Sequence, residues 1–184
     1  MASKACKPGE ERKGIERFLG EHLGLLQQDL SFSGYERDLV ALNLKGKGFR
    51  EISGLSGADS PSDGRAAVYL DYDNDGDTDI FLRAMHGRAH YLFRNEVGAD
   101  AHWLRIAVEG PLGAEVTVKT SAGFLTRLCS AGGGFLAQHD PRLLFGLGDD
   151  KACEWIEVRW PGGKVRRLPA TAAGASLRIR PPAD

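Results

Sequence analysis

The spacing of apolar residues changes near residue 31. In residues 13–30, apolar side chains recur every three or four positions, which places them on one face of a helix; they are Ile15, Phe18, Leu19, Leu23 and Leu26. Beyond residue 31, short apolar runs alternate with polar residues at every second position, as in half-buried strands. The pattern predicts one N-terminal amphipathic helix followed by a body of strands.

Turns rich in glycine and proline separate the predicted strands. Residues 38–44 and 49–52 have the pattern of a hairpin, and residues 53–65 are predicted to form a loop. Further strands are predicted at residues 66–70, 80–82, 91–93, 103–108, 115–119, 124–128, 143–145, 155–160 and 176–180. The fold class expected is mainly β, with an antiparallel β-sandwich or barrel-like C-terminal domain.

Five aspartates stand at every second position between two predicted strands: Asp71, Asp73, Asp75, Asp77 and Asp79. On a straight strand they would share one face about 7 Å apart and repel one another. In a loop, the carboxylates can turn inward around a cation, Gly76 allows a positive-φ bend, and Asp77 offers its backbone carbonyl. The sequence therefore predicts a Ca²⁺ loop, with a solvated acidic turn as the alternative. Leu82 stands where an EF-hand has its glutamate, so the loop is of a β-flanked type.

Charge and hydropathy bear on partners and compartment. A net charge of −1 gives no bulk attraction to nucleic acid or to an anionic membrane surface. No apolar run approaches the roughly 18 residues of a membrane span, and residues 1–13 lack the apolar core of a signal peptide. The chain is therefore intracellular or lacks its targeting segment. Because weak calcium loops fill outside cells, we expect a secreted, periplasmic or cell-surface protein.

The cysteines leave two questions open. Cys6, ahead of a charged spacer, fits either the lipidated cysteine of a bacterial lipoprotein or an incidental tail residue. Cys129 and Cys153 fall in separate predicted strands, and they can pair only if their Cα atoms come within about 7 Å.

Two stretches of the chain resemble known families. Residues 36–95, with Leu42-Asn43, the acidic loop and Arg94-Asn95, look like the last unit of an FG-GAP/VCBS-type repeat region. Residues 102–168 resemble an ASPIC/UnbV domain, on motifs that include Gly132-Gly133-Gly134, Leu144-Phe145-Gly146-Leu147-Gly148 and Trp160-Pro161-Gly162-Gly163. The resemblance implies extracellular, calcium-binding and adhesion-like roles without an assigned catalytic centre. We therefore expect a tail and helix at 1–34, a calcium-loop unit at 35–98 and an ASPIC/UnbV-like β domain at 99–184.

Candidate catalytic groups are few. Ser130 lacks the nucleophile-elbow pattern. His139-Asp140 beside the turn Gly132–Gly134 has the residue types of an acid–base pair, which leaves a calcium-dependent hydrolase as the alternative function. In the resembling family these residues look like part of a turn that packs against the glycines. We therefore expect no enzyme, but a binding or structural module that contacts protein or glycan partners.

Other side chains have two interpretations each. A basic bias in the C-terminal half forms either a solvated face or a site for acidic glycans or carboxylates; it comprises Arg127, Arg142, Arg159, Arg166, Arg167, Arg178 and Arg180. Trp103 and Trp155 each begin an apolar alternation, which favours core or rim packing over a carbohydrate platform.

A single blade-like unit cannot close a propeller, which needs at least about four blades, and it leaves strand edges unpaired. The apolar stripe of residues 15–26 must cover either the chain's own sheet or a second copy. The sequence therefore leaves two alternatives, self-association or coverage of the chain's own sheet.

Overall fold

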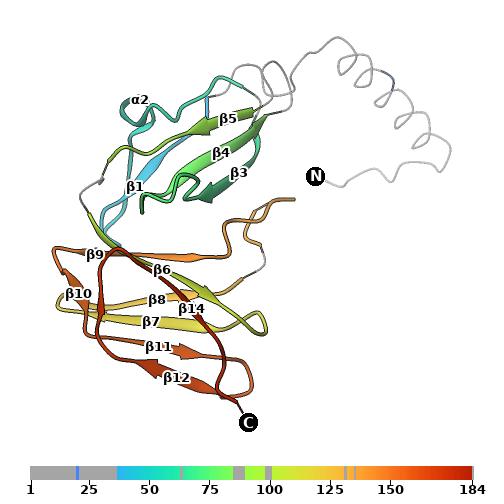
Figure 1. Cartoon of the computed structure of the whole chain (residues 1–184). Coiled ribbons are helices and arrows are strands. Elements are labelled where there is room, and N and C mark those ends of the chain that lie inside the picture. The colour runs from blue at the N-terminus through green and yellow to red at the C-terminus, as the bar shows by residue number, and fades with distance from the viewer. Residues whose placement is uncertain are drawn as a thin grey trace, which may run out of the picture. The chain divides into compact units, whose positions relative to one another are not determined.

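The structure is a computed structural model that describes residues 20, 37–62, 64–84, 90–97, 101–130, 132–134 and 136–183 (Figure 1). Nearly every element in these residues is a β-strand, which confirms the mainly β prediction. The predicted helix at 13–30 lies outside the described residues apart from Gly20, and so do Cys6 and the apolar stripe. Among the helices that the structure describes, none has the length and apolar composition needed to cross a membrane.

The chain divides into two compact units. One comprises Met1–Arg65 and Arg83–His90, and the other comprises Ala66–Leu82 and Tyr91–Asp184. The acidic loop thus belongs to the same unit as the C-terminal strands. The domain boundaries expected after residues 34 and 98 stay predictions.

The first unit contains the predicted hairpin. β1 (Ala41–Asn43) pairs antiparallel with β2 (Phe49–Glu51). The side chain of Asn43 accepts a hydrogen bond of 2.9 Å from the Gly46 N–H, and Gly46 has a φ of 78°, so the turn uses the left-handed conformation that glycine tolerates. A short helix, α2 (Ser53–Ser56), occupies the start of the predicted loop and ends at Gly57, which has a φ of 69°.

The acidic loop connects two strands of a three-stranded sheet. Its order is β3 (Gly64–Leu70), β4 (Asp79–Ala84) and β5 (His90–Phe93). No closed propeller or barrel is formed by the described strands. The loop therefore begins where β3 ends and finishes as β4 begins.

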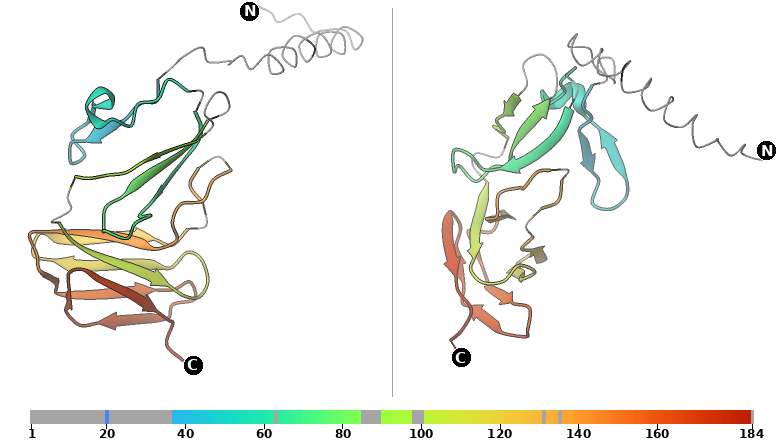
Figure 2. Two further views of the ribbon diagram at one scale, coloured as in Figure 1. Left: turned by 45° about the horizontal axis from the view of Figure 1, so that its top comes forward. Right: turned by 90° about the vertical axis from the view of Figure 1, so that its right-hand side faces the viewer.

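The C-terminal strands of the second unit form one four-stranded and one three-stranded sheet (Figures 1 and 2). One has the order β12 (Val165–Leu168), β11 (Trp155–Arg159), β7 (Glu115–Thr120) and β8 (Gly123–Leu128). The other has the order β14 (Ala175–Ile179), β6 (His102–Val108) and β9 (Leu143–Gly148). β14 pairs parallel with β6, whereas the other pairs in these two sheets are antiparallel, so the expectation of an all-antiparallel domain is wrong at this pair.

The two sheets share one hydrophobic core, as a sandwich requires. Alternate side chains of the strands point into it, and its buried members are Leu104, Ile106, Ala114, Val116, Val118, Phe145, Leu147, Cys153, Ile156, Val158, Trp160 and Ile179. The Trp160 indole N–H donates a 2.8 Å hydrogen bond to the Glu109 carbonyl, which satisfies the polar atom of this buried ring.

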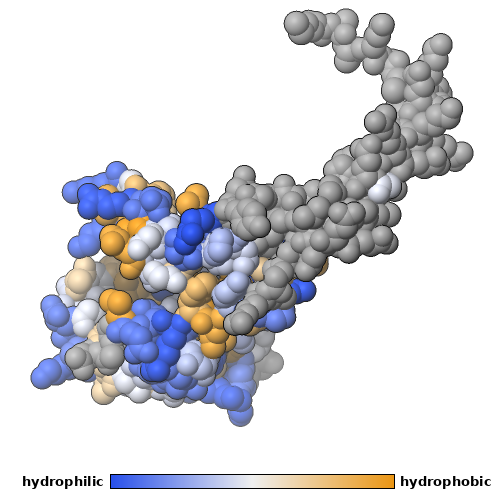
Figure 3. Space-filling model, turned by 90° about the horizontal axis from the view of Figure 1, so that it is seen from above, coloured by the Kyte–Doolittle hydropathy of each residue, from blue (hydrophilic) through white to orange (hydrophobic). Residues whose placement is uncertain are grey.

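On the face seen in Figure 3, hydrophobic residues lie in separate spots among hydrophilic ones. Scattered exposure of this kind is normal for a folded surface.

Strand boundaries differ from the predictions at the C-terminal end. β9 continues to Gly148, beyond the strand predicted at residues 143–145. β12 was not predicted, because Arg166-Arg167 interrupts the apolar alternation; β12 is an edge strand whose only partner in its sheet is β11, so it does not need a regular apolar face. Two further strands, β10 (Ala152–Cys153) and β13 (Thr171–Ala172), are only two residues long.

The register of β7 bears on the cysteines. Cys129 donates its N–H to Ala114 beside the start of β7, while Glu154, next to Cys153, donates to Lys119 near its other end, each at 2.8 Å. Five extended residues separate the two attachment points, a span of about 17 Å. Disulfide formation needs Cα atoms within about 7 Å. Both thiols are free, and this topology does not allow them to pair.

Candidate metal centre

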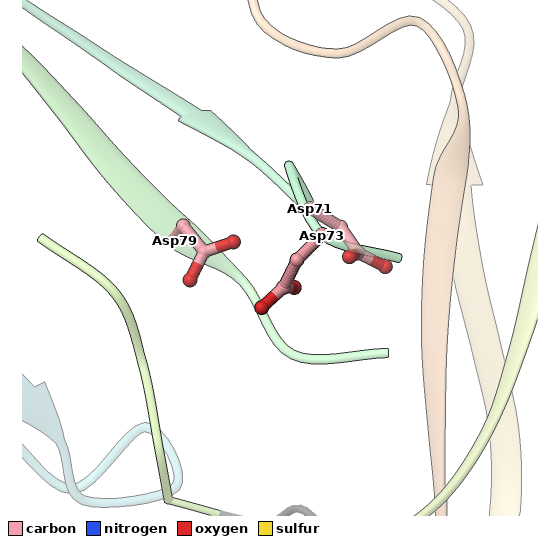
Figure 4. Close-up of side chains that lie close together, drawn as sticks. All are labelled: Asp71, Asp73 and Asp79. Atoms are coloured by element: carbon pink, nitrogen blue, oxygen red, sulfur yellow. The ribbon is translucent and has the colours of Figure 1, made fainter. Parts of the chain in front are cut away.

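The acidic loop curls because two of its residues adopt left-handed backbone conformations. Asn74 has a φ of 65° and Gly76 a φ of 98°. The bend brings one carboxylate oxygen each from Asp71, Asp73 and Asp79 within 4.8 Å of one another (Figure 4). Two oxygens on opposite sides of a calcium ion are about 5 Å apart, since each Ca–O distance is about 2.3–2.6 Å. The acidic triad Asp71, Asp73 and Asp79 can therefore hold a metal ion.

Hydrogen bonds from the backbone hold two members of this triad in place. Asp79 is fully buried, and its two oxygens accept N–H groups from Asn95 at 2.8 Å and from Tyr72 at 3.1 Å. Asp71 is 4% exposed, and its Oδ2 accepts the Gly76 N–H at 3.2 Å. These contacts orient the carboxylates before any ion arrives.

Two buried oxygens of the loop have no hydrogen-bond partner among the described residues. They are Oδ1 of Asp71 and Oδ2 of Asp77. A buried acceptor without a partner costs about 1–3 kcal/mol, and more when it is charged. A bound cation would remove this cost, so the residues present fit a metal ion on physical grounds as well as by spacing.

The two remaining aspartates have different surroundings. Asp75 accepts the Asp77 N–H at 2.9 Å, and its carboxylate lies 3.7 Å from the guanidinium of Arg94. The pKa of Asp77 is raised by burial and, secondarily, by the carboxylates of the other four loop aspartates. Neither residue belongs to the triad of converging oxygens. Their role as metal ligands, through the Asp75 carboxylate and the Asp77 carbonyl, stays a prediction.

Arginines compensate part of the negative charge. Arg94 forms an ion pair of 2.8 Å with Asp73. The buried guanidinium of Arg105, on β6, contacts Oδ2 of Asp71. Arg142 donates to the backbone carbonyl of Asp71 at 3.0 Å and to the Asn74 side chain at 2.7 Å. The sequence indicates only a general basic bias for Arg142 and does not predict the contacts of Arg94 and Arg105 with the loop, because residues that are distant in sequence meet only in the fold.

Trp103 lies against the bend of the loop. A Cβ placed on Gly76 would come within 2.0 Å of the Trp103 indole nitrogen, so no side chain fits at this position. The Arg105 guanidinium lies 4.8 Å from the centre of the Trp103 ring, within the range of a cation–π contact. Trp103 thus packs at the rim, as expected, and what it covers is the acidic loop.

His139 and Asp140 fasten a connecting segment to β3. The Tyr69 N–H donates to Nδ1 of His139 at 3.3 Å, and the Asp140 N–H donates to the Tyr69 carbonyl at 3.2 Å. The Tyr69 and His139 rings stack with centroids 3.6 Å apart. A Cβ on Gly133 would lie 3.2 Å from Nε2 of His139, so His139 packs against the glycine turn, as the resemblance implies.

The Asp140 carboxylate is bound to Arg142. Burial by itself raises the pKa of Asp140, but hydrogen bonds from Arg142 outweigh it and lower that pKa below its ordinary value. Asp140 is therefore ionised and paired near neutral pH. The contacts of His139 and Asp140 are therefore explained by a structural role.

Comparison with known proteins gives two findings. Residues 109–184 match the family model described as ASPIC and UnbV. The chain is 33% identical over 131 residues to cartilage acidic protein 1 of Homo sapiens, an alignment that covers 66% of this chain and 20% of that protein. The Mus musculus protein gives the same values, and the Xenopus tropicalis protein is 34% identical over 116 residues, covering 58% of this chain and 18% of that protein. The chain thus spans about a fifth of the length of these relatives. It contains an ASPIC/UnbV domain and is homologous to cartilage acidic protein 1.

Proposed function

We propose that this chain is a calcium-binding module that works outside cells and contacts protein or glycan partners without catalysing a reaction. The observation that carries the proposal is the buried Asp71 carboxylate, which belongs to the triad and has one oxygen without a partner among the described residues. A folded protein retains such a group at a cost, and a cation offsets that cost.

The charges at the loop favour a divalent ion. Five aspartates lie within nine residues, and the ion pairs found among the described residues join their carboxylates to Arg94 and Arg105. Against these two arginines, about three negative charges remain. Calcium accepts six to eight oxygen ligands in flexible geometry, whereas magnesium requires near-octahedral order. An all-oxygen loop with carboxylates and a backbone carbonyl therefore suits calcium best.

Three observations support the remaining parts of the proposal. The resemblance of residues 36–95 to an FG-GAP/VCBS-type unit and the homology to a protein named for cartilage favour an extracellular setting, where calcium is millimolar. His139 uses Nδ1 for a contact to β3, and both carboxylate oxygens of Asp140 bind Arg142, which favours a binding role over catalysis. The proposed partners, which include further copies of this chain, are supported by the sequence argument alone.

Calcium should stabilise the fold. In about 2 mM calcium, with a Kd near 10⁻⁴ M, binding to the folded state alone raises the melting temperature by about 4–7 °C relative to EDTA. Asp73→Ala should abolish this difference. Differential scanning calorimetry in calcium, magnesium and EDTA measures the effect and identifies the preferred ion.

Asp149→Ala is the matched control, because Asp149 is an exposed aspartate outside the loop. This variant should keep the full response to calcium. Equal melting temperatures in calcium and EDTA for the unaltered protein would exclude the calcium function.

A further inference from the structure

A cavity of about 640 Å³ lies beside the acidic loop, within the second unit. Small-molecule sites typically enclose about 300–1,000 Å³. Its walls come from the end of β3, from Arg105 on β6, from the edge strands β8 and β9, and from Ser130, Gly132 and residues 139–142 between them. Asp71 lines the cavity and is also a member of the metal triad, so the two sites are neighbours.

One charged group of the cavity has no counter-ion among the described residues. Arg127, on β8, is exposed, and its guanidinium lies 5.6 Å from the centre of the Phe145 ring. Within the described part of the chain it makes no hydrogen bond and no ion pair. A guanidinium presents a planar fork of donors that matches a carboxylate. The distance to the Phe145 ring is within the range of a cation–π contact, which favours this position of the guanidinium.

The other charged groups of the cavity are already paired. Asp71 contacts Arg105, and Asp140 binds Arg142 with an oxygen at 2.5 Å from Nη2. Oδ1 of Asp71 has no partner among the described residues, but the proposed function assigns it to the metal ion. The described wall therefore offers no further unpaired carboxylate to an ammonium group, which disfavours amino acids as ligands. Two hydroxyl groups, of Thr78 and Ser130, line the wall and make no hydrogen bond within the described residues. They can exchange hydrogen bonds with hydroxyl groups of a ligand.

We propose that this cavity binds a carboxylate that carries neighbouring hydroxyl groups, the chemistry of a sugar acid, with the carboxylate on Arg127 and ligand hydroxyls on Ser130 and Thr78. The inference rests on the proposed binding function and names a ligand class for it. Leu128 and Leu144 give the cavity an apolar part, against which the C–H face of a sugar ring can lie.

Isothermal titration with sodium D-glucuronate tests the proposal. Glucuronate should bind, whereas D-glucose, which lacks the carboxylate, and acetate, which lacks the hydroxyls, should each bind at least tenfold more weakly. Arg127→Gln should weaken glucuronate binding at least tenfold, and Arg127→Lys should retain part of the affinity. The control Arg159→Gln removes an exposed arginine of β11, a strand of the same sheet that does not line the cavity, and it should bind as the unaltered protein does.

Methyl β-D-glucuronide identifies the source of the ligand. Undiminished binding of the glycoside indicates the end of an acidic glycan, and loss of binding relative to glucuronate indicates a free sugar acid; both results uphold the shared chemistry. The proposal is overturned if glucuronate gives no binding heat, if glucose binds equally well, or if Arg127→Gln leaves the affinity unchanged while its melting temperature shows a folded protein.

Titrations in calcium and in EDTA separate this inference from the calcium function. Calcium stabilisation without glucuronate binding removes the cavity proposal alone. Glucuronate binding that depends on Arg127, in a protein that calcium does not stabilise, removes the calcium function alone.

Discussion

Two demands, one of backbone conformation and one of packing, require glycine at position 76. Its φ of 98° lies in a region that favours glycine, and the Trp103 indole occupies the space where a side chain would lie. The first demand follows from the curl of the loop, and the second follows from the packing of β6 against it. Gly76 therefore couples the shape of the acidic loop to the adjacent strand.

Gly76→Ala should lower the free energy of unfolding by about 2–4 kcal/mol. About 1 kcal/mol comes from the left-handed backbone, and about 1–3 kcal/mol from the collision with Trp103. Chemical denaturation in EDTA measures this cost without the contribution of a metal ion.

Gly162→Ala is the matched control, because Gly162 has a φ of 88° and open space where a Cβ would lie. It should cost only about 1 kcal/mol. In a Trp103→Leu background the cost of Gly76→Ala should fall towards this control value. Equal costs for the two glycines in the unaltered background would show that Trp103 does not constrain the loop.

At the scale of elements, residues between β8 and β9 form hydrogen bonds to the backbone at the end of β3. His139 and Asp140 bond to both backbone polar groups of Tyr69, and Arg142 reaches the Asp71 carbonyl at the end of the same strand. The segment therefore fixes the entry of the acidic loop through backbone contacts, which do not depend on a bound ion.

Asp140→Asn should destabilise the protein at neutral pH and have less effect in acid. Hydrogen bonds from Arg142 lower the pKa of Asp140 in the folded state below its ordinary value of 3.8. Above pH 3.8 the pair contributes fully, at about 1 kcal/mol after screening by solvent. As the pH falls through the lowered pKa, the unfolded state takes up its proton first and the contribution is lost.

Urea denaturation at pH 6 and pH 3 compares Asp140→Asn with the unaltered protein, and Asp149→Asn serves as the control for an exposed aspartate. The unfolding free energies of Asp140→Asn and of the unaltered protein should differ less at pH 3 than at pH 6. A difference that stays constant or widens in acid would contradict the assignment of the Asp140–Arg142 pair.

At the scale of the whole molecule, the core of the second unit lies between two open sheets. β12 and β8 are the edges of one sheet, and β14 and β9 are the edges of the other. Open edges recruit further strands unless other parts of the chain or another molecule cover them. The apolar stripe predicted at residues 15–26 is a candidate for this covering, and it lies outside the described residues.

Light scattering at several concentrations, with and without calcium, tests self-association. Because the apolar stripe must be buried somewhere, we expect oligomers if it faces a second copy, and Phe18→Glu should then dissociate them into folded monomers. If the stripe covers the chain's own strands instead, Phe18→Glu should lower the melting temperature of a monomer. A monomeric mass at every concentration would remove the assembly proposal.

Local sequence patterns determine much of this protein. Alternation of apolar residues identifies most strands, since burial on one face of a sheet requires a period of two. The spacing of five aspartates around Gly76 identifies the acidic loop, because ligand geometry within one short loop is a local property. The glycine turns and the hairpin at residues 41–51 follow from backbone conformation, which is also local.

Only the tertiary structure decides which distant residues meet. It joins Arg105, Arg142 and Trp103 to the acidic loop and places the cysteines at opposite ends of β7. It also places Arg127 at the wall of a cavity with no ion pair among the described residues. It also pairs β14 parallel with β6 and adds β12, whose sequence lacks a regular apolar face. The reason is physical: a period along the chain specifies which face of a strand is buried, but strand order, register and the partners of each charge depend on contacts between segments far apart in sequence.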